Sequence, residues 1–131
     1  MKTLGFHHIQ MKCQDLDASI AFYKPLGITL ERSWGTGEKR GCMLNVGNGN
    51  YLELMAGGEP GDKPEGFVGH FAIQVDDTQA AFDIARANGA AEIRPVTRLD
   101  IPSNPPPPRH PRLRQRPRRR NHRVLPASLK Q

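Results

Sequence analysis

Residues 5–17 read GFHHIQMKCQDLD, and residues 69–78 read GHFAIQVDDT, a weaker copy of the same pattern. Each copy has a histidine at the head of an alternating segment and, seven positions later, an aspartate suited to capping a helix. His8 and Gly27 are nineteen positions apart, and so are His70 and Gly89. The chain is therefore predicted to use one strand–helix–strand unit twice, with a period of sixty-two residues.

The first copy alternates over residues 6–13 as a β-strand does, because successive side chains of a strand point to opposite faces. Ile9 and Met11 lie on an apolar face suited to a core, whereas His8 and Gln10 lie on a polar face. The polar face is predicted to line a wet cavity.

The other elements follow from spacing and turn residues. In the first unit we expect a helix capped by Asp15 and ended by Pro25 and Gly27, strands over residues 28–33, 40–46 and 51–55, and a hairpin turn at residues 47–50. Residues 56–66 are a predicted linker. In the second unit we expect a strand over residues 70–75, a helix capped by Asp77 and closed by Gly89, and an edge strand over residues 92–97.

Three side chains with metal-binding chemistry lie opposite the aliphatic positions of their strands: His8, Glu53 and His70. Imidazole and carboxylate suit zinc, nickel, manganese, iron or cobalt, so convergence of the three would make a metal site. The alternatives are structural: a single histidine on a strand is usually structural or exposed, and Glu53 could pair with a lysine or arginine. His7 is expected on the same face of the strand as Ile9, so it is not included among the candidate metal ligands.

The first copy also carries a family signature. From His8 to Gly27 the sequence reads H-I-x-M-x-C-x-D-L-x-x-S-x-x-F-Y-x-x-L-G, followed by YLEL at residues 51–54 and GHFAIQVDD at residues 69–77. Over about residues 4–100 it resembles the vicinal oxygen chelate superfamily. That superfamily includes glyoxalase I, extradiol dioxygenases, methylmalonyl-CoA epimerase, and the bleomycin and fosfomycin resistance proteins.

The resemblance implies an α+β fold in which two βαβββ modules form a curved mixed sheet around a cleft. The domain would span residues 1–104, with the first module at about 4–56 and the second from about 67. It also implies that His8 and Glu53 are the first module's ligands for a divalent metal ion and that His70 is the second module's first ligand. Glu53 is in addition the candidate catalytic residue.

The implied function is that of a glyoxalase I-like, metal-dependent lyase or isomerase. It would act on a small vicinal-oxygen substrate, such as a hemithioacetal, through a metal-stabilised enediolate. Extradiol dioxygenases generally lack an acid at the position of Glu53, so Glu53 favours the glyoxalase or epimerase side. The alternatives are a non-catalytic small-molecule-binding protein of the bleomycin resistance type and an inactive product. A homodimer is compatible with the resemblance.

Composition bounds the function further. The chain has 131 residues, enough for one domain, and a net charge of +6. Nine Lys/Arg and no acid lie in residues 105–131, so the body is slightly acidic and no nucleic-acid binding is expected of it. No apolar run suits a membrane or a signal peptide, and Cys13 and Cys42 have neither metal-knuckle nor redox spacing. A cytoplasmic location is predicted.

Residues 105–131 depart from the family pattern, because they are rich in proline and arginine where two strands and a fourth ligand, a glutamate, are expected. Such a segment is predicted to be disordered. Residues 116–126 can be encoded so that the next reading frame gives GPDGEIIEFF, which is the missing turn and strand. We therefore predict a frame shift near residues 105–108, which would leave the written chain weakened or inactive. The alternative is a functional arm that binds nucleic acid or anionic membranes.

The nucleotide sequence tests the frame-shift hypothesis. We expect the codons of residues 116–126 to read, one nucleotide later, as a Gly-Pro-Asp-Gly turn followed by a strand containing glutamate. Codons that give no such strand in the other frame would contradict the hypothesis. The alternative of a functional arm that binds nucleic acid or anionic membranes would then remain.

Overall fold

The computed structural model describes residues 1–61, 69–91 and 94–97. Its helices and strands are, in chain order, β1 (His8–Lys12), α1 (Leu16–Tyr23), the 3-10 helix η1 (Lys24–Leu26), β2 (Thr29–Trp34), the 3-10 helix η2 (Gly37–Lys39), β3 (Gly41–Gly47), β4 (Asn50–Met55) and α2 (Thr78–Ala87). The predicted helices and the four strands of the first unit are thus confirmed, with ends shifted by one or two residues.

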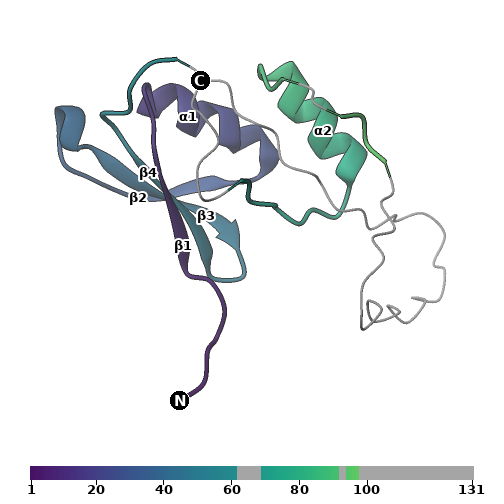
Figure 1. The fold of residues 1–131 in the computed structure, drawn as a ribbon, viewed down its shortest axis with the longest axis horizontal. Coiled ribbons are helices and arrows are strands. Elements are labelled where there is room, and N and C mark those ends of the chain that lie inside the picture. The colour runs from purple at the N-terminus through teal and green to yellow at the C-terminus, as the bar shows by residue number, and fades with distance from the viewer. Residues whose placement is uncertain (62–68, 92–93, 98–131) are drawn as a thin grey trace.

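The four strands form one mixed sheet in the order β1-β4-β3-β2 (Figure 1). β1 runs parallel to β4, and α1, β2 and β3 provide the long connection that a parallel pair requires; β2, β3 and β4 are antiparallel neighbours. The sheet is curved and does not close. This arrangement is one βαβββ module, which confirms the predicted fold class.

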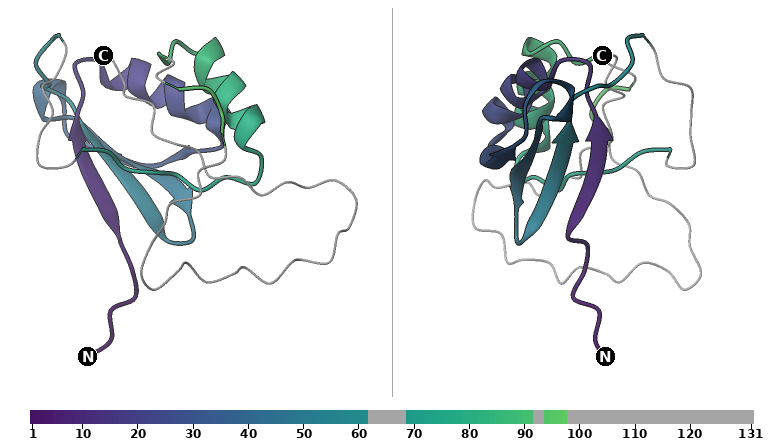
Figure 2. Two further views of the ribbon diagram at one scale, coloured as in Figure 1. Left: turned by 45° about the vertical axis from the view of Figure 1, so that its right-hand side comes forward. Right: turned by 90° about the vertical axis from the view of Figure 1, so that its left-hand side faces the viewer.

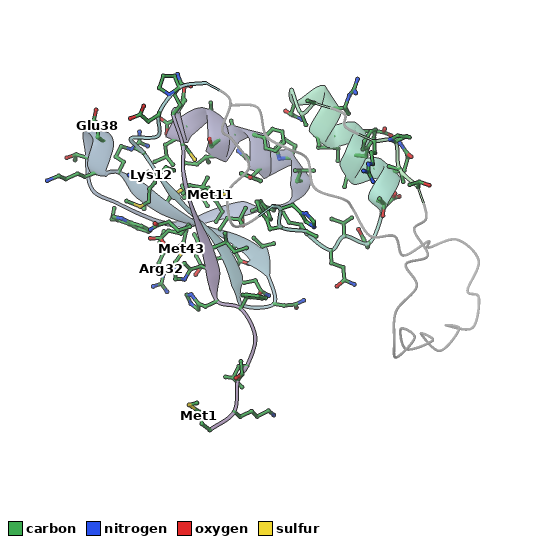
Figure 3. The ribbon with its side chains drawn as sticks, in the orientation of Figure 1. Met1, Met11, Lys12, Arg32, Glu38 and Met43 are labelled. Atoms are coloured by element: carbon green, nitrogen blue, oxygen red, sulfur yellow. The ribbon has the colours of Figure 1, made fainter. Side chains whose placement is uncertain are left out.

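The core lies between the sheet and the helices. Figure 2 shows α1 and α2 on the same side of the sheet. The buried apolar residues come from that side: Cys13, Leu16, Tyr23, Ile28, Cys42, Leu44, Leu52 and Leu54. Met11 also packs on this core, whereas Arg32 and Met43 lie on the side of the sheet away from α1 (Figure 3). The second side, which we call the open face, carries the alternate side chains of every strand.

Helix capping repeats between the two units as predicted. The Asp15 carboxylate accepts a hydrogen bond from the backbone N of Ala18 at 2.9 Å, and the Asp77 carboxylate accepts one from Ala80 at 3.0 Å. α1 and α2 therefore begin sixty-two residues apart, each with an aspartate at its N-cap. In each case the side chain satisfies an amide that the first helical turn leaves without an intrahelical partner.

The strand predicted over residues 70–75 does not form: within the described residues it is reduced to one bridge residue, Gln74. Its alternation survives, because Phe71, Ile73 and Val75 are half-buried and their neighbours are exposed. Phe71 and Ile73 pack against the core of the first unit. A strand needs a neighbouring strand to complete its backbone hydrogen bonds. In the first unit β4 is this neighbour of β1, and the described part of the second unit contains no equivalent of β4.

The edge strand predicted over residues 92–97 is also not found. Residues 94–97 form no strand, and residues 92–93 lie outside the described part of the chain. The predicted tail, residues 105–131, and residues 62–66 of the predicted linker also lie outside it. No helix among the described residues is long and apolar enough to span a lipid bilayer.

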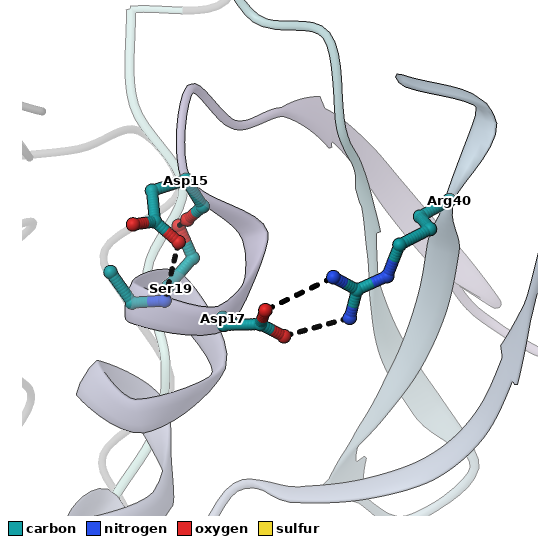
Figure 4. A network of polar contacts seen from close by, with 5 residues as sticks. Asp15, Asp17, Ser19 and Arg40 are labelled. Atoms are coloured by element: carbon teal, nitrogen blue, oxygen red, sulfur yellow. Dashed lines mark hydrogen bonds and ion pairs between the residues drawn. The ribbon is translucent and has the colours of Figure 1, made fainter. Parts of the chain in front are cut away.

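An ion pair joins α1 to the start of β3 (Figure 4). The Arg40 guanidinium donates to both carboxylate oxygens of Asp17, at 2.7 Å and 3.0 Å. The hydrogen bond from Arg40 and its positive charge lower the pKa of the Asp17 carboxyl. The geometry is bidentate, which favours one relative position of the helix and the sheet.

Asp15→Ala is expected to lower the free energy of unfolding by about 1 kcal/mol, because the amide of Ala18 loses its cap. Urea unfolding followed by circular dichroism measures the change. Asp15→Asn is the matched control and should retain the stability, since asparagine caps as well as aspartate. Equal stabilities of the alanine and asparagine variants would contradict this role.

The Asp17–Arg40 pair predicts a pH dependence of stability. Because the pKa of Asp17 is lowered in the folded state, its contribution is present above the ordinary carboxyl pKa of 3.8 and lost as the pH falls through the lowered pKa. Wild type should therefore exceed Asp17→Asn in unfolding free energy at neutral pH, and the difference should disappear in strong acid. A difference that is independent of pH would exclude this linkage.

Candidate metal centre

His8 and Glu53 meet on the open face of the sheet. In the parallel register of β1 and β4, His8 lies opposite Tyr51 and Gln10 lies opposite Glu53. His8 and Glu53 are therefore diagonal neighbours on one face, and Nε2 of His8 lies 3.4 Å from Oε2 of Glu53. The Glu53 side chain is only 16% exposed, whereas that of His8 is 41% exposed. The structure thus brings together two of the three predicted ligands.

Gln10 holds the carboxylate of Glu53 in place. Its Nε2 donates a hydrogen bond to Oε2 of Glu53 at 3.0 Å. The buried Leu52 and Leu54 on either side anchor β4 in the core, so the backbone that carries Glu53 is fixed. The carboxylate therefore has a defined position relative to the His8 ring.

His7, which strand parity excluded, contacts the site directly. Nδ1 of His7 lies 2.8 Å from Nδ1 of His8, and the two rings meet edge to face with centroids 5.1 Å apart. On its other side the His7 ring lies 5.3 Å from the ring of Tyr51. β1 begins at His8, so strand alternation does not fix the direction of the residue before it. The adjacent histidine pair was the only signal in the sequence.

Glu31 is a second carboxylate on the open face that the sequence did not indicate. The pairing of β2 with β3 shifts register between Leu30 and Arg32, so Glu31 occupies a β-bulge. Its oxygens accept hydrogen bonds from Nδ2 of Asn45 at 2.9 Å and from the Tyr51 hydroxyl at 3.3 Å. A bulge cannot be read from alternation, and no other signal in the sequence marks Glu31.

His70 is exposed and lies in the segment that does not form a strand. Among the described residues, no three His, Cys, Asp or Glu side chains lie close enough together to hold a metal ion. The participation of His70 therefore stays a prediction, and the described geometry supplies the pair His8 and Glu53.

An apolar surface lies farther along the same face. In the sheet register Trp34 and Met55 flank Gly41, which is buried and has no side chain. A Cβ on Gly41 would lie 2.5 Å from Sδ of Met55 and 2.6 Å from the Trp34 ring, so both side chains pack over this glycine. Trp34 is still 39% exposed. The face thus combines a polar end with an apolar end.

The donor pair fits a divalent ion. Two ligand atoms held at about 2.1 Å by a tetrahedral ion are about 3.4 Å apart. This matches the separation of Nε2 of His8 and Oε2 of Glu53. Imidazole nitrogen and carboxylate oxygen are ligands that zinc and its neighbours in the first transition row accept.

Comparisons with known proteins agree with the fold. The sequence profile described as Glyoxalase/Bleomycin resistance protein/Dioxygenase superfamily matches residues 5–112. The structure of the trypanothione-dependent glyoxalase I of Leishmania major is similar at 26% identity and a TM-score of 0.52, over 67% of this chain and 68% of that one. The crystal structure of UcmS2 shares the fold at 21% identity and a TM-score of 0.52, over 75% of this chain and 85% of that one. No curated protein matches the sequence.

Proposed function

The chain belongs to the Glyoxalase/Bleomycin resistance protein/Dioxygenase superfamily, and we propose that it is a metal-dependent lyase or isomerase of the glyoxalase I type. The observation that carries the proposal is the 3.4 Å separation between Nε2 of His8 and Oε2 of Glu53 on the open face. The structural similarity to a glyoxalase I at 26% identity supports the same reaction class. The proposed substrate is a small molecule with vicinal oxygens, such as a hemithioacetal or an α-hydroxy carbonyl.

His8 and Glu53 are the proposed ligands from the first module, with His70 as the third. A divalent ion bound there would polarise a substrate carbonyl and stabilise the negative charge that develops on it. Zinc, nickel, manganese, iron and cobalt all suit this donor set.

Glu53 is the proposed catalytic residue as well as a ligand. Gln10 donates to Oε2, which fixes that oxygen beside His8. We propose that Oε1 accepts the proton from the substrate carbon next to the carbonyl group. The carboxyl group would then return this proton to the carbonyl carbon itself. The low exposure of Glu53 limits the water that would compete for this proton.

The apolar end of the open face is the proposed contact for the remainder of the substrate. Trp34 and Met55 present an aromatic ring and a thioether next to Gly41, and such groups bind apolar or aromatic moieties. Substrate orientation would then follow from the two ends of the face, with the oxygens at His8 and the apolar group at Trp34.

Metal binding tests the proposal. We expect the purified protein to bind about one zinc or cobalt ion per chain, and His8→Ala and Glu53→Gln to weaken binding at least about tenfold, since each removes a ligand. Isothermal titration calorimetry with the metal alone measures this. Glu38→Gln, an exposed change on η2, is the matched control and should bind like wild type.

A wild-type protein that binds no divalent ion would contradict the proposed metal-dependent enzymatic function. It would favour the alternative of a small-molecule-binding protein of the same superfamily. A His70→Ala variant that binds the metal ion as tightly as wild type would exclude His70 as a ligand. His8 and Glu53 would then be the remaining proposed ligands. Activity is then assayed with protein in which the reading frame of the C-terminal segment is repaired, against a panel of hemithioacetals and hydroxy-acid thioesters. Turnover that His8→Ala abolishes is the expected result.

A further inference from the structure

We propose that Trp34 determines the substrate specificity of the open face and that the substrate carries an aromatic ring directly next to its vicinal oxygens. The proposal rests on the proposed function and names the chemical class of the substrate for the same site. It is carried by the packing of the Trp34 ring and the Met55 thioether over Gly41, two positions beyond Glu53 on β4.

The Trp34 ring is fixed in place by the strands beneath it. Trp34 pairs with Gly41 and Gly41 pairs with Met55, so the three positions form one row across β2, β3 and β4. A Cβ on Gly41 would lie 2.6 Å from the ring and 2.5 Å from Sδ of Met55. Because both groups approach the same point, the sulfur and the ring are at most about 5 Å apart, a separation at which thioethers and aromatic rings attract. The ring therefore has a defined position before a ligand binds.

The ring is also accessible. Trp34 is 39% exposed, whereas Gly41 beneath it is buried. A surface that is already ordered loses little conformational entropy when a ligand binds to it. Two aromatic rings attract beyond the effect of burying their apolar surface, so an exposed and ordered indole favours an aromatic ligand over an aliphatic one.

The position of the ring relative to Glu53 selects the size of the apolar group. Met55 follows Glu53 by two positions on the same face of β4, which is about 7 Å along the strand. The part of the Trp34 ring that covers Gly41 lies over β3, about 5 Å to the side of β4. A methyl group on a carbon whose oxygens lie at Glu53 would end short of the indole, whereas an aromatic ring on that carbon would reach it.

The surface between Glu53 and Trp34 is apolar. Met43 lies opposite Glu53 in the register of β3 with β4, and both Met43 and Met55 are half-buried on the open face. Thioethers are polarizable and adapt to the edge of an aromatic ring. A ring that stacks on Trp34 would therefore contact methionine side chains on its way to the carboxylate.

A second copy of the chain is the alternative occupant of this surface. The exposed large apolar side chains of the described residues are Met1, Leu4, Phe6, Leu30 and Trp34. The first three precede β1, and Leu30 pairs with the buried Leu44, so within the described residues Trp34 alone represents this set on the open face. A stable interface buries about 800 Å² per partner, which one exposed side chain does not supply. A single aromatic ring matches the surface better.

Tryptophan fluorescence tests the proposal, because Trp34 is the one tryptophan in the sequence. The wild-type chain is titrated, in the presence of zinc, with mandelate and with lactate. These α-hydroxy acids present the same oxygens but carry a phenyl and a methyl group, respectively. We expect mandelate to change the emission and to bind about tenfold more tightly than lactate, because only its ring reaches Trp34. Equal affinities for the two acids would overturn the proposal.

Substitutions of Trp34 separate aromatic stacking from simple burial. Trp34→Leu keeps an apolar side chain and should reduce the preference for mandelate to near one, whereas Trp34→Phe keeps a ring and should retain most of it. Isothermal titration calorimetry measures both variants. Leu30→Ala is the matched control, because Leu30 is an exposed apolar residue of the same strand on the other side of the sheet. A Trp34→Leu variant that keeps the full preference would reject the role of Trp34.

Gly41→Ala approaches the same question from beneath the ring. The added methyl group would displace the Trp34 ring and the Met55 thioether, so the variant should lose affinity for mandelate and keep its affinity for lactate. Urea unfolding checks that the variant is folded, and Trp34→Leu decides alone if it is not. A folded Gly41→Ala variant with unchanged affinity for mandelate would contradict the proposal.

The outcomes distinguish this proposal from the proposed function. Zinc binding together with equal affinities for mandelate and lactate would reject only the aromatic specificity. A preference for mandelate that depends on Trp34, in a protein that binds no zinc, would reject the metal-dependent reaction and assign the aromatic surface to a small-molecule-binding protein of the same superfamily. Trp34 emission that acrylamide does not quench would show that the ring is covered, by a second copy if the protein sediments as a dimer and by the chain itself if it sediments as a monomer. Either result would overturn the proposal.

Discussion

The parallel pairing of β1 with β4 is the constraint on which the site depends. It sets His8 opposite Tyr51 and Gln10 opposite Glu53, so the imidazole and the carboxylate become diagonal neighbours on one face. A shift of one residue in this register would send the polar side chains into the core and the leucines out of it. The buried Leu52 and Leu54, each on the opposite face from Glu53, hold the register through the packing of the core. The same apolar contacts that stabilise the fold therefore position the side chains of His8 and Glu53.

Local signals in the sequence predicted most of the first unit and the helix of the second. Asp15 and Asp77 cap their helices through the same bond to the third amide that follows, an interaction contained within four residues. The strand expected at residues 70–75 did not form, because a strand depends on a neighbouring strand that is distant in the sequence. Its alternating burial is present without the ladder, so the sequence determines which side chains face the core even where it does not supply a pairing strand.

The residues of the candidate site also differ in how far the sequence could predict them. His8 and Glu53 could be predicted, because alternation along a paired strand fixes which way each side chain points. His7 could not, since it precedes the first residue of β1, and Glu31 could not, since a β-bulge places it outside the alternating pattern. His70 has the expected parity in a segment that does not pair, so its direction is not fixed by a sheet. Alternation is thus informative only where the backbone is held by a neighbouring strand.

We propose that the His8 imidazole and the Glu53 carboxylate bind one metal ion together. A crystal structure of zinc-loaded protein, with anomalous data collected at the zinc edge, tests it most directly. We expect an anomalous peak at about 2.1 Å from both Nε2 of His8 and a carboxylate oxygen of Glu53. A zinc ion bound elsewhere, or a His8 ring turned away from Glu53 with the metal present, would contradict it.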